Sequence, residues 1–247
     1  MTALNSAIDP RTMNERIKAL PRDPRGFPVP WFVHIGKDKV ADFRIIGAAK
    51  VEYAIGANLC WICGHALPRD KAFNIGPMCT INRVSAEPPS HRSCAVFAAM
   101  NCPFLTKPRM RRNTKDLPEG HMPPVGKPVM HNPGATCVWV TQEFRVMPVD
   151  NGVLFRIGEP IDVRWFCHGK TATRDEVVKA IGKGLPILID EAKQEGEDAV
   201  RALLQAVQRM RQYLPAHESE DKNNDARQGA PPEEDSPSRP RATSRAR

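Results

Sequence analysis

Alternation of apolar and polar residues predicts β-strands in two parts of this chain. The segments 31–35 (WFVHI) and 42–46 (DFRII) have strand composition, and the turn residues of 36–39 separate them, which is typical of a β-hairpin. Four later segments have the same character: 136–141, 144–147, 153–157 and 161–167. Because Asn151-Gly152 and Gly158-Glu159-Pro160 supply turn signals between them, we expect an antiparallel β-meander.

A capping box predicts the first of the C-terminal helices. The hydroxyl of Thr173 can accept a hydrogen bond from an otherwise unpaired amide, and a glutamate three residues later can accept one from the Thr173 amide. We expect this helix to end near Ile181, before Gly182 and Gly184, and another to begin within 185–190.

A longer helix is expected over 197–214, where apolar residues recur at spacings of three and four. These residues are Val200, Leu203, Val207, Met210 and Leu214. The stripe covers only two heptads, so packing onto the protein's own sheet is favoured over a dimer seam.

Composition narrows the class of protein. The chain has 247 residues, 41% of them apolar, which is enough to fill the core of one full domain or two small ones. No apolar run approaches the roughly 18–20 residues of a membrane helix, and the N-terminus lacks the hydrophobic centre of a signal peptide. We therefore expect no membrane association and a cytoplasmic location. Seven cysteines in such a chain favour metal binding over disulfides.

The net charge of +8 is concentrated in the first half of the chain. Residues 1–120 hold 18 Lys and Arg against 10 Asp and Glu, and the densest stretch is 107–115. Basic stretches attract phosphates through counterion release, although many are only solvated surface. The candidate nucleic-acid contacts are Arg83, Arg92, Lys107, Arg109, Arg111, Arg112 and Lys115.

Two pairs of residues have the spacing of zinc ligands. Cys60 and Cys63 form a CxxC knuckle followed by Gly64, which permits the positive φ that closes such a turn. His91 and Cys94 follow a proline-rich stretch, and with Ser90 as N-cap they fall in the first turn of a helix whose positive end favours a thiolate. This spacing indicates Zn²⁺. Between the pairs, 72–75 and 78–81 flank Gly76-Pro77 and predict a short hairpin.

The remaining cysteines leave alternatives open. Cys79 or Cys102 can replace His91 as the fourth ligand, and an iron–sulfur cluster that uses several of these cysteines is also conceivable. A thioredoxin-like role of the CxxC pair is disfavoured because no βαβ pattern surrounds it. Cys167 lies on the apolar face of the last predicted strand, so we expect a buried structural thiol.

Residues 60–100 resemble a treble-clef zinc finger, in which a knuckle, a hairpin and a helix with the second ligand pair follow in that order. The resemblance rests on CWICG and SHRSC and covers about a sixth of the chain. The wider segment, with GPMCTINR, AEPPSHRSC and NCPFL, resembles a family of bacterial and phage proteins that has no assigned activity. Treble clefs also occur in HNH-type nucleases, but His65 is the only histidine between the ligand pairs, which counts against that activity.

These patterns predict an α+β fold with a treble-clef-like zinc module, an N-terminal β-hairpin, and a β-meander followed by C-terminal helices. The expected segments are an irregular lead-in (1–30), the hairpin and zinc module with the basic stretch (31–115), a Pro/Gly-rich linker (116–135), the meander and helices (136–215) and a disordered tail (216–247).

The function expected from these features is that of a non-enzymatic protein whose structural zinc supports a basic surface for nucleic acid. A protein-interaction or scaffold module with architectural zinc is the first alternative. A degenerate HNH-like nuclease is the second.

Overall fold

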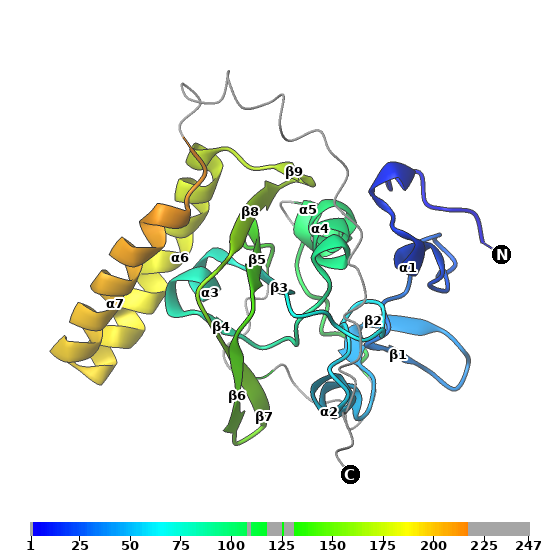
Figure 1. The fold of residues 1–247 in the computed structure, drawn as a ribbon, viewed down its shortest axis with the longest axis horizontal. Coiled ribbons are helices and arrows are strands. Elements are labelled where there is room, and N and C mark those ends of the chain that lie inside the picture. Colours follow the sequence, from blue (N-terminus) through cyan, green and yellow to red (C-terminus); the bar gives the residue numbers. More distant parts are fainter. Residues whose placement is uncertain (1, 108–109, 118–124, 126–130, 217–247) are drawn as a thin grey trace, which may run out of the picture.

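A central antiparallel sheet organises the protein, in the strand order β3-β5-β8-β9 (Figure 1). The computed structural model describes residues 2–107, 110–117, 125 and 131–216. The strands are β3 (Lys71–Ile75), β5 (Thr136–Thr141), β8 (Asp162–Cys167) and β9 (Lys170–Thr171). All six residues of β5 are buried, because β3 and β8 cover its two edges and side chains cover both of its faces. Helices and antiparallel strands together confirm the α+β class.

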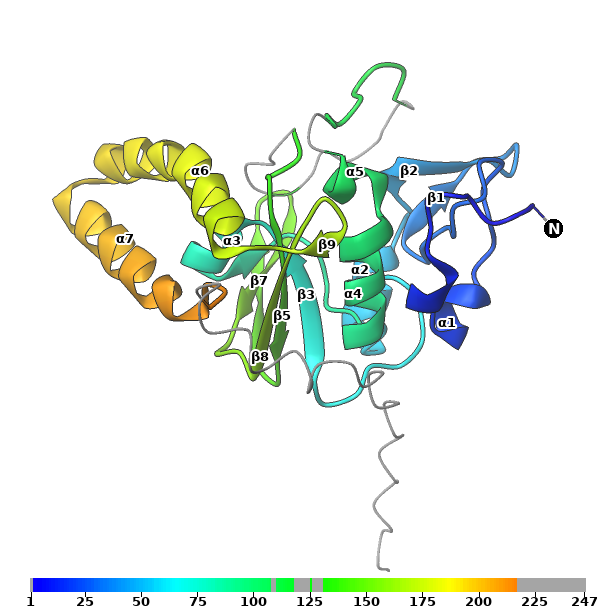
Figure 2. The same cartoon turned by 90° about the horizontal axis from the view of Figure 1, so that it is seen from above.

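Successive residues of β5 face two different layers. Cys137 and Trp139 lie in the main core, against α3 (Pro77–Asn82), α6 (Arg174–Glu195) and α7 (Glu197–Met210). Val138 and Val140 face α4 (Arg92–Asn101), where alanines allow a close approach. Figure 2 shows the sheet between α6 and α4. The period of two along β5 therefore places a helical layer on each face.

The predicted β-meander is wrong in its pairing. β6 (Phe144–Val149) forms a hairpin with β7 (Gly152–Ile157), as Asn151-Gly152 predicts, but β7 then pairs with β4 (Val84–Ser85) in a separate sheet of three strands. β5 pairs with β3 and β8 instead of β6. The sequence shows local turns, whereas these partners come from strands far away along the chain.

The hairpin expected around Gly76-Pro77 is also wrong. Residues 72–75 belong to β3, but 78–81 lie in the helix α3, in which Pro77 occupies the first turn. Proline is favoured there because an amide in the first turn of a helix has no partner within the helix.

The C-terminal helices differ from the prediction in their length. The capping box at Thr173 is confirmed, but α6 continues to Glu195 through two glycines and Pro186. A Cβ atom at Gly184 would lie 2.8 Å from Met78 Sδ, so this glycine permits the close approach of α3. The chain then reverses at Gly196, and α7 returns toward the sheet and ends in a short 3₁₀ helix (Arg211–Tyr213). Four members of the predicted stripe pack on the main core, as expected: Leu203, Val207, Met210 and Leu214.

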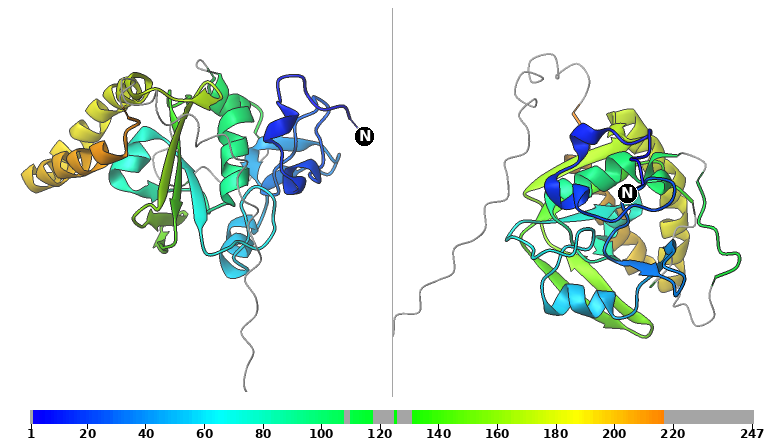
Figure 3. Two further views of the ribbon diagram at one scale, coloured as in Figure 1. Left: turned by 45° about the horizontal axis from the view of Figure 1, so that its top comes forward. Right: turned by 90° about the vertical axis from the view of Figure 1, so that its right-hand side faces the viewer.

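The N-terminal segment lies on the far side of α4 from the sheet (Figure 3). It contains a 3₁₀ turn (Pro10–Thr12) and α1 (Glu15–Lys18), and it is followed by β1 (Val33–Ile35), β2 (Ala41–Ile46) and α2 (Lys50–Gly56). β1 and β2 pair antiparallel, which confirms the predicted hairpin. Ile8, Met13 and Ile17 are buried against the CxxC knuckle. After α4 the chain forms α5 (Pro103–Thr106).

No helix within the described ranges is both long and apolar enough to cross a membrane. The tail predicted for 216–247, apart from Ala216, and most of the linker predicted for 116–135 lie outside those ranges.

Candidate metal site

The CxxC knuckle is a tight loop closed by an isolated antiparallel bridge between Leu59 and Ala66. Its Gly64 amide donates to the Cys60 carbonyl at 2.8 Å, and Gly64 has a φ of +73°. A Cβ atom at this position would lie 2.5 Å from Cδ1 of Trp31. Glycine is therefore required both by the backbone conformation and by the packing against Trp31.

The second pair of residues comes from the start of α4. His91 is the N-cap of this helix, with φ −60° and ψ 146°, and Cys94 is its third residue. The prediction of Ser90 as N-cap is wrong by one residue. Ser90 forms a backbone bridge with Ala72 of β3, with N–O distances of 2.8 and 2.7 Å, so its extended conformation is set by the sheet. This bridge fixes the start of α4 against β3.

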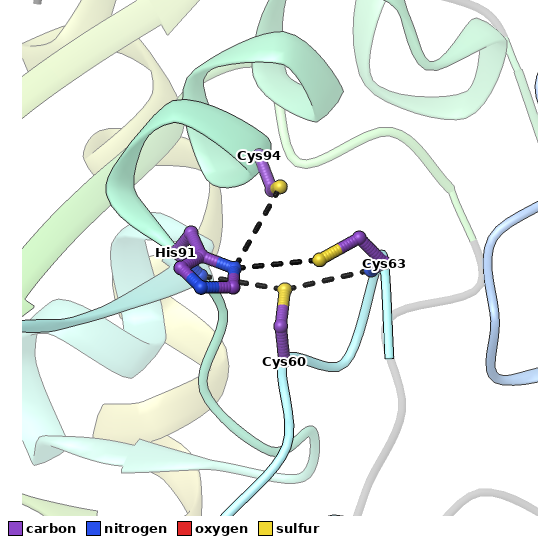
Figure 4. Close-up of side chains that lie close together, drawn as sticks. All are labelled: Cys60, Cys63, His91 and Cys94. Carbon is purple, nitrogen blue, oxygen red and sulfur yellow. Dashed lines mark hydrogen bonds between the residues drawn. The ribbon is translucent and has the colours of Figure 1, made fainter. Parts of the chain in front are cut away.

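Four side chains converge in the space between the knuckle and α4 (Figure 4). Their ligand atoms all lie within 4.8 Å of one another, and the four residues are buried: Cys60, Cys63, His91 and Cys94. His91 Nδ1 lies 3.4 Å from the Cys63 sulfur and 4.0 Å from the Cys94 sulfur. Three sulfur donors and one imidazole nitrogen at this spacing can hold a metal ion, and such a donor set suits transition metals.

Hydrogen bonds around the cluster orient its donors. Nε2 of His91 lies 3.0 Å from the Ala66 carbonyl oxygen, which can only accept, so Nε2 is the nitrogen that donates. In the neutral imidazole the lone pair then lies on Nδ1, the atom that faces the sulfurs. The Cys60 sulfur accepts from the backbone amides of His91 and Cys63, at 3.4 and 3.5 Å. These contacts favour the thiolate that a metal requires.

Mutual hydrogen bonds also shift the pKa values within the cluster. Burial opposes ionisation of Cys60, but hydrogen bonds with Cys63, Cys94 and His91 outweigh it and lower the Cys60 pKa far below its ordinary value. Burial would lower the pKa of His91, yet hydrogen bonds with Cys60 and Cys63 raise this pKa to about 10. Hydrogen bonds to the same two cysteines raise the pKa of Cys94. A metal must therefore displace protons from His91 and Cys94, so its affinity falls as the pH falls.

Asn14 is a further residue of the site that sequence reasoning missed. Its Oδ1 accepts a hydrogen bond from the Ile17 amide at 2.9 Å and so caps α1. Its Nδ2 donates a hydrogen bond to Ser93 Oγ at 2.8 Å and lies 3.7 Å from the Cys94 sulfur. Only the helix-capping role has a sequence signal, because the contact with Cys94 spans 80 residues.

We expect Asn14→Ser to lower metal affinity about tenfold, at the low end of the 10–100-fold effects of residues that orient metal ligands. Serine keeps an N-cap acceptor but is too short to donate to the Cys94 sulfur. Competition with a chromophoric zinc chelator measures the affinity. Asn14→Ala serves for comparison, since it should also lose about 1 kcal/mol of stability through the missing cap. An unchanged affinity in both variants would show that the amide contact is unimportant for the metal.

The other cysteines considered as ligands are not part of this cluster. Cys79 lies in α3 and packs against the main core, whereas Cys102 is half-buried at the junction of α4 and α5. Burial raises the pKa of each thiol. His65 is exposed, and its Nδ1 donates to the Cys63 carbonyl at 3.1 Å.

The predicted basic contacts fall into two groups. Arg83 forms an ion pair with Glu159, lies over the Trp139 and Tyr213 rings and has a side chain only 18% exposed. Arg92 pairs with Asp162 of β8. The exposed group consists of Lys107, Arg111, Arg112 and Lys115, and Arg109 lies outside the described residues. The second group therefore exposes more positive charge to solvent than Arg83 and Arg92, whose charges are paired with carboxylates.

Comparison of this chain with family models, with curated proteins and with solved structures found no match. Its function is therefore inferred from the geometry of the site.

Proposed function

We propose that Cys60, Cys63, His91 and Cys94 bind a structural Zn²⁺ ion. The observation that carries this proposal is the convergence of four buried donors, with the second nitrogen of His91 held on a backbone carbonyl. Three thiolates and one imidazole form a common ligand set of structural zinc. Four protein ligands leave no open position for substrate, which supports a structural role over a catalytic one.

A treble-clef-like order supports the same proposal. A knuckle is followed by a helix, α4, that supplies the second ligand pair. The element between them departs from the pattern, because β3, α3 and β4 replace a simple hairpin. The zinc joins the knuckle to α4, and the N-terminal segment with Ile17 packs over both.

We propose further that the protein is not an enzyme and that it contacts nucleic acid through the basic stretch of residues 107–115. The charged residues of this stretch are Lys107, Arg109, Arg111, Arg112 and Lys115. The stretch follows α5, which comes directly after α4, the helix whose start supplies His91 and Cys94. Arg44 of β2 donates to the Lys115 carbonyl at 2.7 Å, which attaches one end of the stretch to the β-hairpin. Arg83 and Arg92 have carboxylate partners, so their contribution to phosphate binding should be small.

Replacing Arg111 and Arg112 together by glutamine should weaken nucleic-acid binding. Each phosphate contact contributes about −0.9 to the slope of log K against log salt on duplex DNA, so the slope should fall in magnitude by about 2. Fluorescence anisotropy with duplex DNA and single-stranded RNA, at about 50 to 200 mM salt, measures both quantities. Lys179→Gln with Lys183→Gln removes the same charge from the exposed surface of α6 and is the control.

Equal losses in the two double variants would mean that net charge alone drives binding, and no binding at low salt would contradict the proposal. Plasmid incubated with the protein and Mg²⁺ or Mn²⁺ should stay intact, whereas cleavage would favour the nuclease alternative.

Exposed apolar residues favour a second candidate function, that of a protein-interaction module. Val178, Ile187 and Leu204 on α6 and α7 are 48%, 60% and 54% exposed. Burial of these side chains by a partner would favour association through the hydrophobic effect. Light scattering and pull-down separate this function from nucleic-acid binding.

A further inference from the structure

A second group of potential metal ligands lies where β8 turns into β9 and α6 begins. The ligand atoms of Cys167, His168 and Glu176 all lie within 4.8 Å of one another. Cys167 belongs to the main core, whereas the knuckle cysteines pack with the N-terminal segment in a different cluster. This group is therefore separate from the zinc site proposed above.

The backbone holds each of the three residues in place. Cys167 is the last residue of β8, and its thiol donates to the Gly134 carbonyl at 3.2 Å. His168 and Gly169 have φ values of +52° and +78° and form the two-residue turn between β8 and β9. Glu176 is the third residue of α6, where one carboxylate oxygen accepts from the Thr173 amide at 2.9 Å. A strand end, a tight turn and a capped helix thus position the three donors.

We propose that Cys167, His168 and Glu176 bind a divalent transition-metal ion of the zinc class. Sulfur, imidazole nitrogen and carboxylate oxygen are the three donor types of protein zinc sites. With bonds of about 2.0–2.3 Å, tetrahedral ligands lie roughly 3.3–3.8 Å apart. Because no two of the ligand atoms are more than 4.8 Å apart, the group has to contract by at most about 1.5 Å, and the exposed side chain of His168 can supply this movement by rotating about its own bonds.

Three protein ligands make this site different from the first one. The fourth position is open, and water can reach it because His168 is exposed. Metal binding here releases the Cys167 thiol proton to solvent and replaces its hydrogen bond to Gly134 by a metal–sulfur bond. Glu176 keeps its capping contact through one oxygen and can use the other as a ligand.

The chain offers substitutions that remove a ligand and preserve its structural role. His168→Asn keeps a residue that tolerates positive φ in the turn, and Glu176→Gln keeps the capping box of α6. Lys183→Gln changes a charge nearby on α6 without removing a donor and is the matched control. Circular dichroism of each variant checks that the fold is unchanged.

The experiment is a titration of the full chain, with its first site already loaded with Zn²⁺, by further Zn²⁺ in a calorimeter. We expect a second equivalent to bind to the wild-type protein and to Lys183→Gln. Its affinity should fall at least tenfold in His168→Asn and in Glu176→Gln. A Co²⁺ titration of the same samples should show a sulfur-to-cobalt charge-transfer band for the second ion, and this band should be absent from Cys167→Ala.

If the wild-type chain, with its first site already loaded, bound no further ion, the proposal would be overturned. A second ion that binds equally well to His168→Asn and Glu176→Gln, or without the charge-transfer band, would overturn it too, since it would then lie elsewhere on the surface. Neither result would affect the first site, which is measured separately as the ion retained before the titration.

Discussion

Replacing Cys60 by serine should release the metal and unfold the part of the protein built around it. Cys60 is fully buried and belongs to the four-residue cluster. Its sulfur also accepts hydrogen bonds from two backbone amides. Apparent binding free energies of structural zinc are about 10–16 kcal/mol in small zinc domains, whereas whole domains are stable by about 5–15 kcal/mol. Loss of the ion therefore removes free energy comparable to the entire stability. We expect a decrease of more than about 4 kcal/mol.

Metal content by elemental analysis, together with urea unfolding followed by circular dichroism, checks this expectation. Cys79→Ser and Cys102→Ser are the controls, since neither thiol belongs to the cluster. Both should retain one ion per chain at the first site. A Cys60→Ser protein that folds like the wild type, or a wild-type chain that carries no metal when purified under reducing conditions, would contradict the structural role of zinc.

The clustering of Cys60, Cys63, His91 and Cys94 was predictable because its signals are local. The CxxC knuckle needs only four residues and one glycine, and His91 with Cys94 needs only the start of one helix. The structure brings together the four residues that this spacing indicates. Asn14 could not be found in this way, because its contact with Cys94 depends on how the N-terminal segment packs over α4.

The sheets and α6 show where local signals fail. Gly182 and Gly184 predict a helix end, yet α6 continues because packing against α3 and α7 stabilises it. Pro186 cannot donate to the Gly182 carbonyl, but Gly182 is exposed, so water can satisfy that carbonyl. Likewise, no local pattern states that β5 pairs with β3, a strand more than 60 residues earlier in the chain.

Helix α4 connects the candidate metal site to this central sheet. Cys94 and Phe97 pack with the knuckle and the N-terminal segment, whereas Ala95 and Ala99 pack on β5. One helix thus shares its two faces between the metal site and the sheet. We infer that destabilising β5 also loosens the metal ligands on α4.

Replacing Trp139 by alanine tests this connection and should lower stability by about 3–5 kcal/mol. Trp139 of β5 is fully buried, its Nε1 donates to the Gly158 carbonyl at 3.0 Å, and its ring lies 4.9 Å from the Tyr213 ring. The substitution leaves a large cavity, removes these contacts and leaves a carbonyl without its donor. Two urea concentrations are measured: the midpoint of the loss of ellipticity, and the midpoint of metal release, which a chromophoric chelator reports. Both midpoints should decrease.

Trp139→Phe is the matched control for the lost ring. Phenylalanine fills most of the space, so the decrease should be about 1–3 kcal/mol and should come from the unpaired Gly158 carbonyl. Comparison of the unfolding midpoint with the metal-release midpoint shows whether the metal site and the sheet unfold together. If metal release kept its wild-type midpoint while ellipticity changed, the metal site would unfold independently of the sheet. If α4 couples the two parts, both midpoints should decrease together in each variant, in proportion to its loss of stability. The reason is that α4 cannot keep His91 and Cys94 in place once the face that carries Ala95 and Ala99 has lost its contact with the sheet.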